Sequence, residues 1–434
     1  MLTAVIIFCV TTIVMIASVL FFPKLNIKRL HLDTYYIITT IGAIAMLVFN
    51  KTDFSTVAKA LTSHSAINPI KILLLFISMT VLSIFLDELG FFRYLASFTL
   101  KHAKSGQFKL FLYLYLTVSV LTVFTSNDII VLSFTPFICY FAKNAKINPL
   151  PYLTAEFVAA NTWSMALIIG NPTNIYLATA CGLSFAKYLS ISILPTVFAG
   201  ITAFITLLLI YKKQLRQPIS GESEEVKIDD KLLLVIGIIH LGICTVLLAI
   251  SSYIGIEMWL VSVCAVISLA VTNLIISLIR KRRPSQLLSC VKRAPYQLVP
   301  FVVSMFVMIV ALNSQGATQK LAALLGGNYP ILKYGVSSFL FSNIINNIPM
   351  SVLFSSVLQV SGNSLPAVFA TIIGSNLGAI LTPIGSLAGI MWTSILNKYG
   401  QKFSYTDFLK NGIACGVPTL AAALLGLFIA FLII

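Results

Sequence analysis

The feature that most constrains this chain is a series of long apolar runs without charges. Residues 3–22, "TAVIIFCVTTIVMIASVLFF", are uncharged throughout, and a helix of this length crosses a hydrocarbon layer of about 30 Å. Only 10% of the residues are charged, against about 25% in soluble domains. The sequence therefore predicts a polytopic helical membrane protein, in the plasma membrane of a prokaryote-like cell, with further spans near 35–50, 70–86, 110–125, 129–142, 188–211, 232–252, 257–279, 297–312 and 411–434.

The net charge of +16 comes from short basic loops between the apolar runs. "KLNIKR" (24–29), "RKRR" (280–283) and "VKR" (291–293) have the pattern of cytoplasmic loops under the positive-inside rule. These charges form neither a face nor a tail, so the expected partner is the lipid bilayer and not nucleic acid. The seven cysteines contain no C-x-x-C pair and the four histidines no ligand spacing, so we expect no disulfide framework, metal site or cofactor.

A hydrophilic stretch at 211–231, "YKKQLRQPISGESEEVKIDDK", has the composition of a solvated linker and separates two halves that resemble each other. "FLDELGFFRYLA" (85–96) aligns without gaps on "ALNSQGATQKLA" (311–322), which places Gly90 opposite Gly316. Because further matches keep the same order, we interpret the halves as an internal repeat. The further matches are "SND" (126–128) with "INN" (345–347), Asn161, Gly170 and Asn171 with Asn376, Gly385 and Ser386, and "SFAKYL" (184–189) with "SYTDFL" (404–409).

The basic residues indicate that the two repeats are inserted in opposite directions. In the first half more of them follow span 70–86 than precede it, whereas in the second half more precede span 297–312 than follow it. If basic loops face the cytoplasm, the second repeat is inverted, which is typical of alternating-access secondary transporters. We therefore expect an all-α protein with four parts: N-terminal transmembrane helices (1–50), a first transporter repeat (51–211), a hydrophilic cytoplasmic linker (212–231), and two leading helices with the second, inverted repeat (232–434).

Four polar clusters interrupt the apolar sequence, two in each repeat: "TSNDII" (125–130), "GNPTN" (170–174), "NIINNIP" (343–349) and "TPIGS" (382–386). A kink or a polar helix contact would explain any one of them, but four at equivalent positions favour a binding site. Non-helical backbone at membrane depth needs protein or a water-filled cavity around it, and half-helix N-termini there can face an anion. The substrate-binding candidates are Asn127, Gly170, Asn171, Thr173, Asn174, Asn346, Asn347, Asn376, Thr382, Gly385 and Ser386.

Carboxyl groups inside apolar runs are costly, and they usually mark function. Asp128 has apolar residues on both sides, and Glu156 lies five residues before Asn161. Either carboxyl could bind a coupling H⁺ or Na⁺. Asp87 and Glu88, which close span 70–86, fit a solvated membrane interface equally well.

Several of these motifs resemble the arsenical pump membrane protein family. They are "FLDELGFF" (85–92), "ND" followed by "TPF" (127–137), "NNIP" (346–349) and, most specifically, "GSNLGAILTPIGSLAGIMW" (374–392). That family belongs to the ion transporter superfamily, with citrate and other carboxylate carriers. The resemblance implies an inverted-topology repeat with two re-entrant helical hairpins and broken helices, and substrate held between the hairpin tips and the breaks. It also implies two partners: a second copy in a homodimer and, for an arsenite pump, a separate ATPase subunit.

The resemblance has informative departures. Asn161 and Asn376 stand where the arsenite efflux pattern has aspartates, Ile129 replaces a glycine, and "GNPTN" is closer to the signature of carboxylate carriers. A neutral, donor-rich site suits an anion. The sequence therefore predicts a secondary active transporter of a small anion (a carboxylate, an inorganic anion or an arsenite-type oxyanion) that uses alternating access coupled to H⁺ or Na⁺. The alternatives are a cation/proton antiporter and a passive channel. We expect no enzyme, because H-E-x-x-H, G-x-S-x-G and the Walker motif are absent.

Overall fold

The computed structural model describes residues 1–22, 24–27, 30–62, 68–102, 106–217, 228, 230–251, 253–401 and 403–433. Within these residues, eight helical segments are long and apolar enough to cross a membrane. The described part also contains a short antiparallel hairpin, β1 (Lys24–Ile27) paired with β2 (Leu30–Asp33). The predicted polytopic helical fold is confirmed. Residues 218–227 and 229 of the predicted linker lie outside the described residues.

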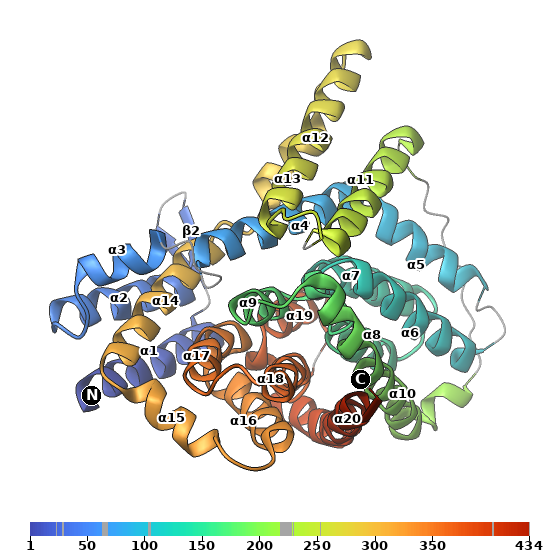
Figure 1. The fold of residues 1–434 in the computed structure, drawn as a ribbon. Helices are drawn as coiled ribbons and strands as arrows, with labels where there is room; N and C mark the ends of the chain where they lie inside the picture. Colours follow the sequence, from blue (N-terminus) through green and yellow to red (C-terminus); the bar gives the residue numbers. More distant parts are fainter. Residues whose placement is uncertain are drawn as a thin grey trace.

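The two halves of the chain have the same order of helices (Figure 1). The first half consists of α1 (Leu2–Phe21), α2 (Thr34–Val48), α3 (Phe54–Thr62), α4 (Pro69–Glu88), α5 (Phe91–His102), α6 (Gln107–Phe124), α7 (Asn127–Asn144), α8 (Leu150–Trp163), the 3₁₀ turn η1 (Ile168–Gly170), α9 (Pro172–Ala180) and α10 (Phe185–Tyr211). After η2 (Gln214–Arg216), the second half consists of α11 (Lys231–Ile250), α12 (Met258–Ile279), α13 (Ser285–Arg293), α14 (Leu298–Ser314), α15 (Ala317–Leu325), α16 (Pro330–Ile345), α17 (Asn347–Val360), α18 (Leu365–Gly378), η3 (Pro383–Gly385), α19 (Leu387–Lys398) and α20 (Tyr405–Ile433).

Matched residues have the same local role in both repeats. Gly90 and Gly316 precede α5 and α15 with left-handed φ values of 78° and 77°, a conformation that glycine adopts without strain. Ser184 accepts a hydrogen bond from the Lys187 N–H at the start of α10, at 3.2 Å. Ser404 accepts one from the Asp407 N–H at the start of α20, at 3.1 Å. The short sequence matches therefore mark equivalent turns and helix caps.

Contacts at the ends of α4 and α14 show that the equivalent helices run in opposite directions. Arg293, the last residue of α13, donates to the carboxylates of Asp87 (2.6 Å) and Glu88 at the C-terminal end of α4. Because α14 begins shortly after Arg293, its N-terminal end lies on the same side as the C-terminal end of α4. The other end of α14 is marked by Gln315, whose side chain accepts a hydrogen bond from the Met1 amino group at 3.0 Å. The predicted inversion is confirmed, and Asp87 and Glu88 form ion pairs.

The leading helices of each half pack against a long helix of the other half. Helix α2 packs against α14, and α12 packs against α4. The contacts include Thr40 with Ser304, whose hydroxyls are 3.0 Å apart. In Figure 1, α1–α3 lie beside α14, α11 and α12 project from the top of the view beside α4, and α10 and α20 lie side by side. Helices α1–α3 thus correspond to α11–α13. The domain boundaries at residues 50 and 211 remain predictions from the sequence.

Candidate functional site

Helices α8 and α18 both break inside the protein, and the candidate polar residues form the breaks. After α8 the chain passes through η1 and restarts as α9, whose first N–H groups are capped by Asn171: its Oδ1 accepts from the Thr173 N–H at 3.1 Å. After α18 the chain passes through η3 and restarts as α19, where Ser386 Oγ accepts from the Gly389 N–H at 3.1 Å. Asn171 and Ser386 are therefore the N-cap residues of equivalent helices in the two repeats.

Glycine is required at both breaks because the backbone folds back on itself. A Cβ atom on Gly170 would lie 2.3 Å from the Ser164 carbonyl oxygen, and one on Gly385 would lie 2.8 Å from the Gly378 carbonyl oxygen. Both distances are shorter than real Cβ contacts. Gly170 and Gly385 therefore shape the site through the backbone and offer no side chain to a ligand.

The two re-entrant hairpins turn between α6 and α7 and between α16 and α17. Asn346 forms the second turn with a φ of 71°, which asparagine tolerates better than most residues. Its Oδ1 accepts from the Ile348 N–H at 3.2 Å, and its Nδ2 donates to the Ile384 carbonyl at 2.9 Å. At the first tip Asn127 Nδ2 donates to Asn161 Oδ1 at 3.1 Å. Each hairpin tip is therefore tied to the broken helix of its own repeat.

The repeats meet at Asn376, whose side chain uses its whole hydrogen-bonding capacity. Its Oδ1 accepts from Ser164 Oγ (3.0 Å) and Asn171 Nδ2 (2.8 Å) of the first repeat. Its Nδ2 donates to Asn174 Oδ1 (2.6 Å) and to the Ile372 carbonyl of its own helix (2.8 Å). All these side chains are buried. This Asn376 network is a neutral contact between the two breaks.

Close helix packing places Asn376 at this position. Its neighbours Gly374 and Gly378 form a G-x-x-x-G pattern on α18, and Cβ atoms there would lie 2.4 Å from the Gly335 carbonyl and 2.6 Å from the Phe339 carbonyl of α16. Such small residues let membrane helices approach closely. Next to them Asn343 donates to the Gly378 carbonyl and accepts from Thr382 Oγ1 at 2.6 Å. The most family-specific motif, 374–392, therefore encodes the second break and the packing that supports it.

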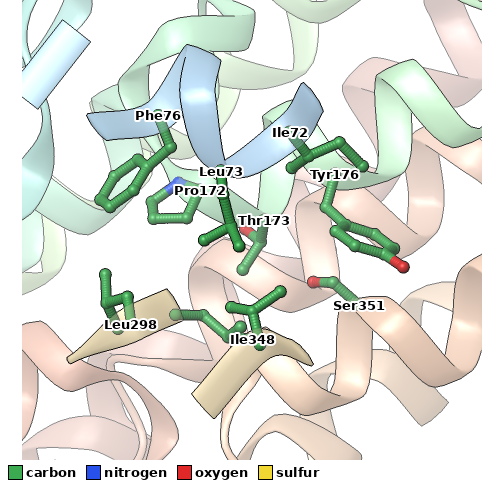
Figure 2. A pocket seen from close by; sticks show the side chains of 10 residues that line it. Ile72, Leu73, Phe76, Pro172, Thr173, Tyr176, Leu298, Ile348 and Ser351 are labelled. Carbon is green, nitrogen blue, oxygen red and sulfur yellow. The ribbon is translucent and has the colours of Figure 1, made fainter. Parts of the chain in front are cut away.

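The N-terminal ends of α9 and α17 converge on a cavity of about 20 Å³ (Figure 2). Thr173 of α9 and Ser351 of α17 line it, with apolar side chains of α4 and α14 around them. Thr173 Oγ1 and, at the start of α17, Asn347 Oδ1 are buried, and among the described residues neither atom has a hydrogen-bond partner. The volume suffices for about one water molecule. The N-terminal ends of two short helices from different repeats meet here, and Thr173 on the cavity wall has a hydroxyl without a partner in the described residues; Asn347 directly precedes the lining residue Ile348.

The two predicted coupling carboxyls lie in different surroundings. Glu156 on α8 is fully buried; both its oxygens accept from Thr135 Oγ1 at 3.1 Å, and Oε2 also accepts from Trp392 Nε1 at 3.3 Å. Asp128 lies in the first turn of α7, half-buried, and no hydrogen bond to its carboxylate is found within the described residues. Thr135 is on α7 and Trp392 on α19, so Glu156 also joins the two repeats.

The structure thus brings together Asn171, Asn174 and Asn376 in one network and places Thr173 on the wall of the cavity, whereas Asn347 precedes the lining residue Ile348. Asn127 and Asn346 lie at the hairpin tips, each bonded within its own repeat. Sequence reasoning missed the roles of Ser164, Asn343, Thr135 and Trp392. Asn343 stands inside a cluster that was recognised as polar, so the cluster was a usable signal. Thr135 and Trp392 lie within the motifs "TPF" (135–137) and 374–392, so the motifs were a usable signal, but the sequence does not show that either residue hydrogen-bonds to Glu156.

Comparisons with known proteins agree with this architecture. A family model described as citrate transporter matches residues 10–364. The arsenical pump membrane protein of Escherichia coli strain K12 is 27% identical over 373 residues, which cover 81% of this chain and 84% of that protein. The 46 kDa membrane protein of Mycobacterium leprae is 27% identical over 386 residues, covering 84% of this chain and 87% of that protein.

A solved structure has a similar fold. The crystal structure of the YdaH transporter of Alcanivorax borkumensis aligns with a TM-score of 0.60 over 99% of this chain and 98% of that one, at 12% identity. At this identity the likeness concerns the fold alone.

Proposed function

This chain belongs to the citrate transporter family, and on that premise we propose that it is a secondary active transporter that moves a small anion across the plasma membrane by alternating access. The observation that carries this proposal is the meeting of α9 and α17 at the cavity that Thr173 lines. Two half-helix N-termini from oppositely inserted repeats converge there, capped by Asn171 and Asn346. Helix N-termini favour bound anions, since their free N–H groups and dipoles point outward.

The neutral side chains favour an anion over a cation as the transported solute. A cation/proton antiporter needs carboxylates at the centre of the site, whereas the central positions here are Asn161 and Asn376. The cavity has room for only about one water molecule, so a carboxylate or an arsenite-type oxyanion requires α9 and α17 to separate. In the proposed cycle this separation exposes Thr173 and Asn347 to the solute and exchanges the hydrogen bonds of the Asn376 network for bonds to it.

Coupling is assigned to the two buried or half-buried carboxyls. Glu156 receives hydrogen bonds from one hydroxyl and one indole N–H, and indole N–H can only donate. Na⁺ needs several oxygen ligands, whereas the two side chains that bond to Glu156 supply one oxygen, the Thr135 hydroxyl, and one N–H group. Glu156 therefore suits a proton better than Na⁺. Asp128, which faces no donor in the described part of the chain, is assigned to whichever coupling ion the transported anion requires.

The test is transport by the purified full chain in liposomes. Citrate, dicarboxylates, phosphate, sulfate and arsenite are offered under imposed H⁺ and Na⁺ gradients. We expect saturable flux of one anion class that collapses with an uncoupler or without the gradient. Flux that does not saturate would indicate a channel, and gradient-driven movement of a cation with no anion flux would indicate an antiporter. Either result, or no flux at all, overturns the proposal.

A matched pair of variants tests the site itself. Thr173 and Thr179 both lie on α9, and the hydroxyl of each is buried without a partner in the described structure. Only Thr173 lines the cavity between the repeats. We expect Thr173→Val to raise the KM for the transported anion and Thr179→Val to leave it unchanged. Equal effects of the two substitutions would show that the solute binds elsewhere.

Two partners belong to the same proposal: a second copy in a homodimer and, if the anion is arsenite, a separate ATPase subunit. Light scattering of the detergent-solubilised chain measures the first. Arsenite flux with and without ATP in cells that contain or lack an ATPase subunit measures the second.

A further inference from the structure

Four aromatic side chains, which we call the aromatic layer, cover one side of Glu156: Phe157, Trp392, Phe403 and Phe408. The Trp392 ring is 1% exposed, and its centre lies 5.1 Å from that of Phe157, 5.3 Å from Phe403 and 5.6 Å from Phe408. Its indole N–H points inward to Glu156. The outer member, Phe403, is half-exposed, and residues 404–407 beyond it are exposed. Glu156 is thus separated from the protein surface by this layer.

A small cavity of about 10 Å³ adjoins the layer and is lined by Thr154, Asn411 and the aromatic rings. Thr154 hydrogen-bonds to Tyr211, with the oxygens 2.9 Å apart. Tyr211 is the last residue of α10, directly before Lys212 and Lys213. Lys398 and Lys410, near the layer in sequence, are also exposed. Under the positive-inside rule this basic end of the bundle faces the cytoplasm.

The contacts of Glu156 adapt to both protonation states. As a carboxylate it accepts from Thr135 and Trp392, and such charge-assisted bonds are stronger than neutral ones. As an acid its O–H can donate to the Thr135 hydroxyl, which also accepts, while the bond from Trp392 weakens. Among the described residues, the Cys139 thiol of α7 is a further titratable group near Glu156. Asp407 and Lys410, at the start of α20, are exposed beyond the layer.

The second repeat has no carboxyl group at the position equivalent to Glu156, which would lie toward the opposite membrane face. The position five residues before Asn376, equivalent to Glu156, is Thr371, which donates to the Ala367 carbonyl of its own helix at 2.8 Å. The position equivalent to Trp392, six residues after the Asn171 cap as Trp392 is after Ser386, is Leu177. The pairing of a carboxyl group with an aromatic cover is therefore not repeated at the equivalent positions of the other repeat.

We propose that Trp392 is the cytoplasmic gate of Glu156: the carboxyl group exchanges its proton with water on the cytoplasmic side, past the Trp392 ring, and the aromatic layer closes this route between turnovers. Trp392 acts as a positioning residue, because it holds the carboxylate and blocks the route without itself exchanging a proton. The inference rests on the proposed function through the coupling role of Glu156, but its test does not require knowledge of the anion.

The test measures from which side Glu156 can be reached. A water-soluble carbodiimide is added to sealed inside-out or right-side-out vesicles that contain the full chain, and labelled carboxyls are located by mass spectrometry. Asp407 and Asp53 are matched orientation controls, since both are exposed and each accepts a 2.6 Å hydrogen bond from a nearby hydroxyl. Asp407 lies in the first turn of α20. Asp53 lies near the C-terminal end of α14, where the Lys51 carbonyl accepts a hydrogen bond from the Gln315 side chain. We expect Asp407 to be labelled in inside-out vesicles and Asp53 in right-side-out ones.

For the gate, we expect slow labelling of Glu156 in the unsubstituted chain, from the cytoplasmic side only. Trp392→Ala and Phe403→Ala should speed it several-fold from that side, while Trp392→Phe, which keeps an aromatic ring, should stay near the unsubstituted rate. Phe403 does not touch Glu156 in any described contact, so its variant answers the question even if Trp392→Ala fails to fold. Equal rates in all variants, or faster labelling from the opposite side, overturn the gate. Failure of anion transport with this labelling pattern intact would overturn the proposed function alone.

Discussion

Replacing Asn376 by aspartate is the most exacting test of the Asn376 network, because aspartate has the same shape. The substitution puts an oxygen in place of Nδ2, 2.6 Å from Asn174 Oδ1 and 2.8 Å from the Ile372 carbonyl. Two hydrogen bonds become contacts between acceptors. Asn174 cannot relieve this by flipping its amide, since its own Nδ2 donates to the Ser164 and Leu167 carbonyls.

The magnitude follows from counting the lost partners. A buried polar group left without its partner costs about 1–3 kcal/mol, so two such contacts predict that Asn376→Asp lowers the free energy of unfolding by about 2–6 kcal/mol. Asn161→Asp is the matched control at the equivalent position of the first repeat. Asn161 Nδ2 donates only to the Phe157 carbonyl, and its Oδ1 can still accept from Asn127. One lost bond predicts a cost of about 1–3 kcal/mol.

The assay is the thermal unfolding midpoint of each purified variant, followed by tryptophan fluorescence at neutral and at acidic pH. We expect the order unsubstituted chain, Asn161→Asp, Asn376→Asp, from highest to lowest midpoint. At acidic pH the deficit of Asn376→Asp should shrink, because the protonated acid can donate one of the two lost bonds. An Asn376→Asp midpoint equal to or above that of Asn161→Asp would refute the assignment of Asn376 as the saturated contact between the repeats.

Three further substitutions test other parts of the structure. Gly170→Ala should destabilise the first break by about 1–3 kcal/mol through overpacking, because the new Cβ would lie 2.3 Å from the Ser164 carbonyl oxygen. Gly416→Ala is the control: its new Cβ would lie 3.6 Å from the nearest atom, so the same unfolding assay should show no change. Asp128→Asn should abolish gradient-coupled uptake while membrane expression stays normal, and unchanged uptake would remove its coupling role. Arg293→Ala should lower the unfolding free energy by about 1–3 kcal/mol, because Asp87 and Glu88 lose their cation. The Arg293 side chain is 37% exposed, so water screens part of this interaction. Arg283→Ala, at an exposed position, is the control and should have little effect.

The long lipid-facing helices could be predicted from the sequence alone. Every apolar run coincides with an observed helix, from 3–22 in α1 to 411–434 in α20. The order and inversion of the repeats also followed from short matches and basic loops. This works because lipid satisfies no backbone hydrogen bonds, so a helix exposed to lipid must be continuous and apolar.

The central helices could not be predicted as readily. Helices α8, α9, α18 and α19 are short and carry polar residues, because the surrounding protein takes the place of lipid. Most residues of α8, α9 and α18 are buried, so hydrophobic periodicity carries little information in these three helices. The polar clusters did indicate the breaks, but not which amides bond to one another. That Asn376 contacts Asn171 and Asn174 depends on the approach of two helices far apart in the sequence.

The departures from repeat symmetry have a physical consequence for a protein of this design. Two identical inverted repeats would give the inward-open and outward-open conformations the same free energy, because each state is the other viewed from the opposite side. Asp87 and Asn313 occupy equivalent positions, yet Asp87 accepts from Arg293 and from Ser133 of the hairpin helix α7, whereas Asn313 accepts from Thr318 and Gln319 of its own repeat. Through Asp87, the hairpin helix α7 is therefore linked to Arg293 at the basic end of the bundle, and the described part of the chain shows no equivalent link to the second hairpin. Because charged contacts weaken with salt and amide contacts do not, we expect ionic strength to act unequally on the two conformations of the proposed transport cycle.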